Sequence, residues 1–141
     1  MVVEGGREGR DICAAAEAAV ILLDTHAAIW IAQRHRRVRA LERFARIYLS
    51  PASVLEIQFL LDAGRLRLSE GRSASMLAGD DRWRLDEPPA AKWFMTACEL
   101  DWTRDPFDRL LAAHARLRGW KLATADTLLL ERLAPSELLP L

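Results

Sequence analysis

The run AVILL, at residues 19–23, restricts the fold of this chain more than any other segment. All its residues are apolar, there is no polar alternation, and an acid, Asp24, follows directly. Continuous apolar runs of this length are typical of strands that are covered on both faces, as in parallel sheets flanked by helices. We therefore expect a buried parallel strand that ends at Asp24.

Segments with strand and helix patterns alternate along the rest of the chain. Further strands are predicted at IYL (47–49), RWRL (82–85), WKLAT (120–124) and ELLPL (137–141), the last confined to an edge by its proline. Helices are predicted at residues 25–35, 36–46, 50–64, 73–79, 88–100, 104–119 and 125–133. This alternation predicts an α/β fold with a parallel sheet and right-handed crossovers.

The composition is that of one globular domain. The chain has 141 residues, 51% of them hydrophobic and 28% charged, and its 20 acidic and 20 basic residues cancel. Cys13 and Cys98 lack zinc-site spacing, so we expect them to be reduced. The chain shows neither a signal-peptide pattern nor an apolar run of the ~20 residues that span a membrane, and we expect a cytoplasmic protein.

The stretch RDPFDRLL, at residues 104–111, places two acids at a predicted helix start. Asp105 is suited to the N-cap position, where its carboxylate accepts from free backbone N–H groups, and Pro106 suits the first helical position. Asp108, in the first turn, interacts favourably with the helix dipole. Local physics thus explains both acids as parts of a helix start, and only the rest of the chain indicates a further role.

Four acids fall near one edge of the predicted sheet. Asp24 and Asp126 follow strands, whereas Glu56 and Asp108 lie in the first turns of helices. Ligand sites in parallel sheets form outside the carboxyl ends of the strands. Carboxylates at ~4 Å repel by about 4 kcal/mol per pair at an effective dielectric of 20, so such a cluster favours protonation or a cation. With oxygen ligands only, that cation is expected to be Mg²⁺, with Mn²⁺ as a substitute.

The motifs ILLDTHAAIW, LSPASVLEI, RDPFDRLLAAHA and LATAD, in this order, resemble those of PIN-domain ribonucleases. The resemblance is strongest to the VapC-type toxins of type II toxin–antitoxin systems and covers about residues 20 to 134. It implies a three-layer α/β/α fold with a central parallel sheet of four to five strands. We expect residues 1–18 to form a poorly ordered N-terminal extension and residues 19–141 a single PIN domain.

The resemblance also implies a role for individual residues. Asp24, Glu56, Asp108 and Asp126 match the family's metal-binding catalytic acids. Thr25 and Thr124 are expected to orient carboxylates or a water, and Asp105 to cap its helix first and contact metal second. The implied activity is Mg²⁺-dependent hydrolysis of RNA that leaves a 5′-phosphate and a 3′-hydroxyl. The implied partners are a cognate antitoxin, which would place an arginine near the acids, and a second copy of the chain in a homodimer.

Other interpretations remain open at this point. A catalytically inactive PIN-fold module that binds RNA or protein is the main alternative, although all four acids are present. A phosphatase with Asp24 as nucleophile is disfavoured because position 26 is histidine instead of a second acid. The basic segment RHRRVRALERFAR suits RNA phosphates, an acidic partner or simple solvation equally well. His26 is more often structural than substrate-binding at a helix start, and tryptophans such as Trp30 are expected to be packing anchors.

Overall fold

The computed structural model describes residues 19–141, so the expected extension at residues 1–18 lies outside the described residues. One sheet of five parallel strands has the order β3-β2-β1-β4-β5. The strands are β1 (Val20–Leu23), β2 (Arg46–Leu49), β3 (Arg84–Leu85), β4 (Lys121–Thr124) and β5 (Leu138–Pro140). The predicted α/β class and the parallel sheet of four to five strands are confirmed, with β3 and β5 at the edges.

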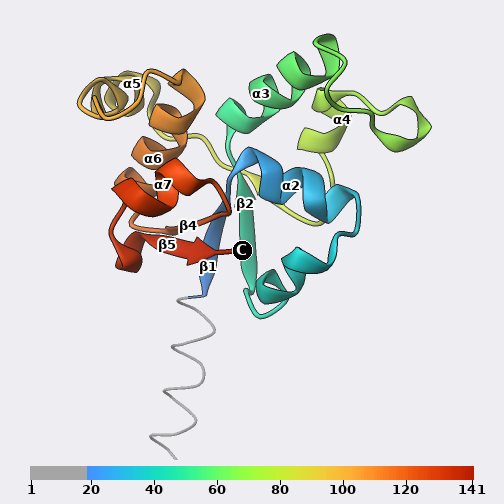
Figure 1. Cartoon of the computed structure of the whole chain (residues 1–141), viewed down its shortest axis with the longest axis horizontal. Coiled ribbons are helices and arrows are strands. Elements are labelled where there is room, and N and C mark those ends of the chain that lie inside the picture. Colours follow the sequence, from blue (N-terminus) through green and yellow to red (C-terminus); the bar gives the residue numbers. More distant parts are fainter. Residues whose placement is uncertain (1–18) are drawn as a thin grey trace, which may run out of the picture.

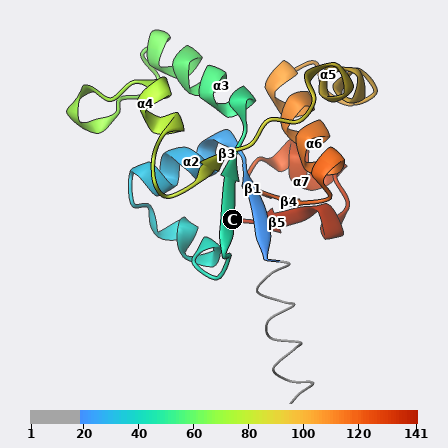
Figure 2. The same ribbon diagram turned by 180° about the vertical axis from the view of Figure 1, so that it is seen from behind.

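Helices cover both faces of this sheet. The α-helices are α2 (Thr25–Ala32), α3 (Pro51–Asp62), α4 (Ala74–Ala78), α5 (Ala90–Cys98), α6 (Pro106–Arg118) and α7 (Thr127–Arg132). The 3₁₀ helices are η1 (Arg36–Leu41), η2 (Ser69–Gly71) and η3 (Pro135–Glu137). In Figure 1 and in the reverse view of Figure 2, α2, α3 and α4 lie on one side of the strands, and α5, α6 and α7 lie on the other. The molecule therefore has the three layers expected of an α/β/α fold.

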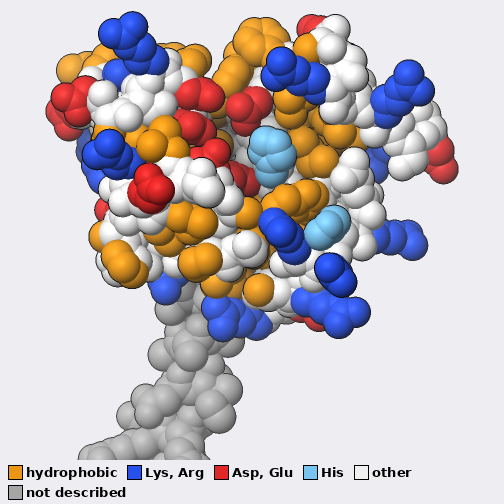
Figure 3. Space-filling view, in the orientation of Figure 1, with side chains coloured by type: hydrophobic (Ala, Val, Ile, Leu, Met, Phe, Trp, Pro, Cys, Tyr) orange, Lys and Arg blue, Asp and Glu red, His pale blue; other side chains and the backbone are white. Residues whose placement is uncertain are grey.

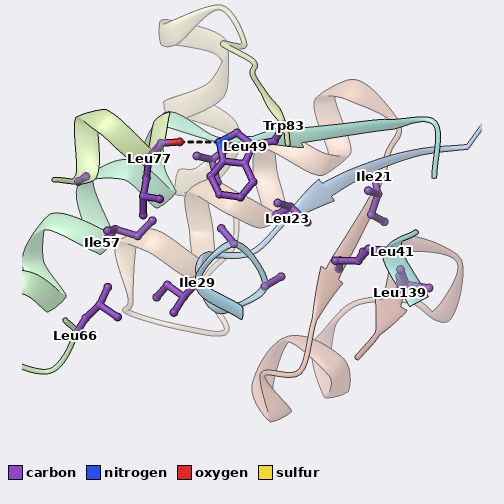
Figure 4. Close-up of a cluster of buried hydrophobic side chains, with 14 residues drawn as sticks. Ile21, Leu23, Ile29, Leu41, Leu49, Ile57, Leu66, Leu77, Trp83 and Leu139 are labelled. Atoms are coloured by element: carbon purple, nitrogen blue, oxygen red, sulfur yellow. Dashed lines mark hydrogen bonds between the residues drawn. The ribbon is translucent and has the colours of Figure 1, made fainter. Parts of the chain in front are cut away.

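The position of β1 between the two helical layers explains why its sequence is apolar throughout. Ile21 and Leu23 pack into one core with α2, α3 and α4, whereas Leu22 packs into the other with α5, α6 and α7. Figure 4 shows the first of these cores, where the Trp83 indole also donates a hydrogen bond of 2.9 Å to the Leu77 carbonyl. Since burying each leucine or isoleucine side chain stabilises a fold by about 1.5–3 kcal/mol, β1 anchors both layers.

The predicted helix at residues 36–46 is wrong. The chain forms only the short 3₁₀ helix η1 there and then turns into β2. Leu41 is buried, and Val38 and Phe44 pack against the same core. These three apolar residues recur every three positions, which matches the three residues per turn of a 3₁₀ helix instead of the 3.6 of an α-helix.

A buried polar network links α3, α6 and the segment after β3. His114 on α6 has Nδ1 at 2.9 Å from Ser50 Oγ and Nε2 at 2.7 Å from Asp86 Oδ2. Arg118 donates to the same Asp86 oxygen at 2.8 Å. Although a serine, a histidine and an acid in a row are reminiscent of a hydrolase triad, Ser50 and His114 are both 0% exposed. Ser50 also caps α3 by accepting from the Ala52 N–H, so the network is structural.

None of the helices between residues 19 and 141 is both long enough and apolar enough to cross a lipid bilayer.

Candidate active site

Asp24 lies at the carboxyl end of β1 and begins the next helix. Its Oδ1 accepts from the Ala27 N–H at 2.8 Å, which makes Asp24 the N-cap of α2. Its Oδ2 accepts a hydrogen bond from the Thr124 hydroxyl. Burial raises the pKa of Asp24, and the hydrogen bonds from Thr124 and Ala27 oppose that rise. A carboxylate with both oxygens held in this way has a fixed orientation, and each oxygen keeps lone pairs for a further ligand.

Thr124 connects Asp24 to Asp126. It is the last residue of β4, which pairs directly with β1. While its hydroxyl donates to Asp24, its oxygen accepts from the Asp126 N–H at 3.0 Å. Asp126 in turn caps α7 by accepting from the Leu129 N–H at 3.0 Å. The contact that would let Thr124 orient a carboxylate is therefore its hydrogen bond to Asp24.

Glu56 approaches the same region from α3. It is half-buried, and burial raises its pKa, whereas the nearby Thr25 hydroxyl lowers it and the charges of Asp105 and Asp24 raise it further. Thr25 donates a hydrogen bond of 3.1 Å to Ser53 Oγ, which is fully buried. Sequence reasoning missed Ser53. The signal was its position three residues before Glu56, which places both side chains on one face of α3.

Asp105 and Asp108 divide the two roles that RDPFDRLL suggests. Asp105 is the N-cap of α6 and accepts from the N–H groups of Phe107 at 2.8 Å and Asp108 at 3.3 Å. Asp108 is half-buried, and its pKa is raised to about 7. The causes are burial first, and then the charges of four neighbouring acids: Asp105, Asp126, Glu56 and Asp24.

All four predicted acids therefore lie close enough for their charges to influence one another. Figure 3 shows acidic side chains gathered around a hollow in the middle of this face, with a histidine beside them. The four acids and the two threonines offer carboxylate and hydroxyl oxygens as metal ligands, which are the ligand atoms that Mg²⁺ and Mn²⁺ prefer. Within residues 19–141 no three acidic, histidine or cysteine side chains already surround one point as a ligand set. The donor chemistry fits a hard divalent cation, and the carboxylates would have to turn toward it.

The family model of the PIN domain matches residues 21–134. This chain belongs to the PIN domain family. The matched region of this PIN domain contains Asp24, Glu56, Asp108 and Asp126, together with both threonines of the site. No curated protein matches the chain in sequence.

Two solved structures share the fold of this PIN domain. A toxin–antitoxin complex from Klebsiella pneumoniae is 17% identical with a TM-score of 0.60, and the match covers 84% of this chain and 95% of that one. VapBC2 from Rickettsia felis, bound to a DNA fragment from its promoter, is 15% identical with a TM-score of 0.61, over 86% of this chain and 98% of that one. At such low identity the likeness establishes the fold of this PIN domain.

Proposed function

We propose that this PIN domain is a Mg²⁺-dependent endoribonuclease and the toxin of a toxin–antitoxin pair. The observation that carries the proposal is the Thr124 hydroxyl, which joins Asp24 to Asp126 within a group of mutually repelling acids. Thr124 contacts the carboxylate of Asp24 and the backbone N–H of Asp126, and the charges of Asp126, Glu56 and Asp24 raise the pKa of Asp108, which isolated surface acids would not do. Membership of the PIN domain family and the fold shared with a toxin–antitoxin complex support the same function.

We infer that Asp24, Glu56, Asp108 and Asp126 hold the cation, with Mn²⁺ as a substitute for Mg²⁺. When bound, such a cation polarises the scissile phosphate and favours deprotonation of the attacking water. Thr124 fixes the orientation of Asp24, and Thr25 positions the α3 face that carries Glu56 through its contact with Ser53. Without a cation, burial and the neighbouring carboxylates raise the pKa of Asp108 to about 7, and a bound cation would offset that repulsion and favour the ionised, ligating form.

The proposed protein partners follow from the surface of the molecule. The acid-lined hollow suits an arginine of an antitoxin, since a guanidinium pairs with carboxylates in a fixed geometry. For a homodimer, Phe94 and Met95 on α5 are 55% and 69% exposed, and Phe59 on α3 is 55% exposed. Large exposed apolar side chains of this kind are typical of surfaces that a partner covers. Helix α2 is less suited to this contact, because its apolar residues Ala27, Ala28 and Ile29 are buried in the protein's own core.

The function is tested by incubating the purified chain with a single-stranded RNA in Mg²⁺ or Mn²⁺ and in EDTA. We expect cleavage with either cation and none with EDTA. Asp126→Asn should abolish cleavage without unfolding α7, because asparagine is as good an N-cap as aspartate. Asp101→Asn, which removes an exposed acid before α6, serves as the control and should cleave normally. Cleavage that persists in EDTA would reject the metal mechanism, and RNA binding without cleavage would favour the inactive module.

A further inference from the structure

A pocket of about 330 Å³ borders the acid cluster, beside the start of α2 and the start of α7. Its lining consists of His26, Trp30, Arg37, Ala125, Asp126 and Thr127. Asp126 belongs to both the pocket and the cluster, and His26 lies close enough to Asp24 and Glu56 for its charge to influence both. Whatever occupies the pocket therefore lies next to the acids.

One wall of the pocket combines an aromatic ring with a cation. The Arg37 guanidinium carbon lies 5.2 Å from the centre of the Trp30 ring, a cation–π contact. Trp30 follows His26 by four positions on α2, so both side chains lie on the same face of the helix. The lining also includes Asp126 with its neighbours Ala125 and Thr127, at the start of α7. The pocket thus combines an arginine held over an aromatic ring with a predicted metal ligand.

The turn after α2 holds this wall in place. Arg34 has a φ of 56°, in the left-handed region, and the His35 N–H donates to the Trp30 carbonyl at 2.8 Å. His35 also stacks on Trp30, with ring centres 5.3 Å apart. Its Nδ1 accepts from the Arg37 N–H at 3.1 Å. A non-glycine residue with positive φ is strained, so the surrounding contacts must fix the turn that brings Arg37 back over Trp30.

We propose that this pocket binds an unpaired nucleotide of the RNA substrate, next to the phosphate that is cleaved. The inference rests on the proposed function and adds a substrate-binding subsite to it. Arg37 is exposed and lies over the Trp30 ring, so its guanidinium plane can stack on an unpaired base, and a guanidinium also binds phosphate oxygens in a bidentate manner. Bases within a duplex hide their faces, so the subsite selects single-stranded RNA. An acidic peptide would also be attracted to Arg37, but its carboxylates pair with the edge of a guanidinium and do not stack on its plane.

The basic segment around the pocket provides a matched control. Arg39 lies two positions after Arg37 in η1, is exposed, and is absent from the pocket lining. Arg37→Gln and Arg39→Gln remove the same charge from the same segment. If the segment attracts RNA only through its net charge, the two variants weaken binding equally. If the pocket binds a base, only Arg37→Gln has a large effect.

The experiment measures the binding of a labelled single-stranded RNA, and of the matching duplex, by fluorescence anisotropy. The full chain carries Asp24→Asn in every sample, so that no RNA is cleaved. We expect Arg37→Gln and Trp30→Leu to raise the Kd for single strands about tenfold each. Arg39→Gln should change it less than about twofold, and none of the variants should change duplex binding by more than that. Trp30→Phe keeps an aromatic ring and should retain most of the affinity for single-stranded RNA. An equal loss of affinity in Trp30→Phe and Trp30→Leu would indicate that both variants act through folding.

Equal weakening by Arg37→Gln and Arg39→Gln would overturn the subsite, as would normal RNA binding by Trp30→Leu. Variants that keep RNA affinity but lose affinity for a polyglutamate peptide would overturn it in favour of an acidic protein partner. In the background with Asp24 intact, Arg37→Gln should raise KM for single-stranded RNA and leave kcat within about twofold. If the parent chain cleaves RNA and these variants bind it normally, the subsite fails and the proposed function stands. If the parent binds RNA through Trp30 and Arg37 but never cleaves it, the subsite stands and the proposed nuclease function fails.

Discussion

The Thr124 hydroxyl donates a hydrogen bond to Asp24, although the two residues are 100 positions apart in the sequence. The same oxygen accepts from the backbone N–H of Asp126, so one side chain connects the Asp24 carboxylate to the turn that follows β4. The pairing of β1 with β4 makes this contact possible, because parallel neighbours end at the same edge of the sheet. The arrangement of the site thus follows from the topology of the fold.

Thr124→Val tests this relationship. The substitution keeps the shape of the side chain, but it removes the donor from a buried carboxylate and the acceptor from the Asp126 N–H. We expect a loss of about 1–3 kcal/mol in the free energy of unfolding, measured in urea, and a loss of about tenfold or more in RNA cleavage. Thr124→Ser should recover much of both.

Thr96→Val is the matched control for this prediction. The Thr96 hydroxyl donates to the Lys92 carbonyl at 2.8 Å on α5, away from the acids. Its loss should leave cleavage unchanged. Thr124→Val with the stability and activity of Thr96→Val would show that the bridge between the two acids is unimportant.

The raised pKa of Asp108 predicts how the free energy of unfolding depends on pH in the presence of EDTA. Folding raises its pKa from 3.8 to about 7, so between these values the folded state holds a proton that the unfolded chain has released. This contribution to stability is complete below pH 3.8 and is lost as the pH rises through about 7. Asp108→Asn should therefore unfold with a free energy higher than that of the parent at about pH 8, by on the order of 1–3 kcal/mol.

The same comparison at lower pH and with metal completes the test of Asp108. The advantage of Asp108→Asn should shrink toward about pH 4, where the parent carboxyl is protonated as well. Added Mg²⁺ should stabilise the parent more than the variant, because a bound cation stabilises only the state that binds it. A difference that does not depend on pH would mean that Asp108 is not under the electrostatic influence of its neighbours.

His114 predicts an opposite dependence on pH. Burial lowers its pKa below 6.5, although the adjacent Asp86 carboxylate opposes the change. The unfolded chain takes up a proton as the pH falls below 6.5, and folded His114 does so only at lower pH, so its contribution is present above pH 6.5 and is lost as the pH falls. Removing the opposing charge with Asp86→Asn should lower the pKa of His114 further, as measured by NMR titration of the ring.

Asp86→Asn should also destabilise the fold by about 1–3 kcal/mol, because Arg118 and His114 lose a charged partner. RNA cleavage should not change, since the network lies apart from the acids of the site. Glu87→Gln, at the next and exposed position, controls for the loss of charge. A rise of the His114 pKa in Asp86→Asn would contradict the described geometry.

The exposed side chains of α5 predict the oligomeric state. If a second copy covers Phe94 and Met95, the double variant Phe94→Glu/Met95→Glu should be monomeric by light scattering at concentrations where the parent is dimeric. Lys92→Gln on the same helix should remain dimeric. A monomeric parent would remove this part of the proposal without affecting the active site.

Much of the fold could be predicted from local chemistry. Ser50 before Pro51 and Asp105 before Pro106 begin helices as their capping and backbone preferences require, and Gly119, with a φ of 69°, ends α6. The approach of Asp24 and Asp126 could be anticipated because they follow parallel strands that end at one edge of the sheet, whereas that of Glu56 and Asp108 also depends on how α3 and α6 pack. The short helix η1 differs from the predicted α-helix because its apolar residues Val38, Leu41 and Phe44 recur every three positions.

Contacts between side chains that are far apart in the chain could not be predicted from the sequence. His114 lies 64 positions from Ser50 and 28 from Asp86, and no local pattern couples these residues. The same holds for Thr25 and Ser53, which are 28 positions apart and whose hydrogen bond depends on how α2 packs against α3. The stacking of Arg37 over Trp30 depends on a left-handed residue, Arg34, where the sequence offers no glycine.

The metal site is tested by a crystal structure of the full chain with Mn²⁺, located by its anomalous scattering. We predict a peak at about 2.0–2.3 Å from carboxylate oxygens of at least three of the four acids Asp24, Glu56, Asp108 and Asp126. A fully occupied Mn²⁺ ion bound elsewhere, with these four carboxylates pointing apart, would show that the four acids do not form a metal site.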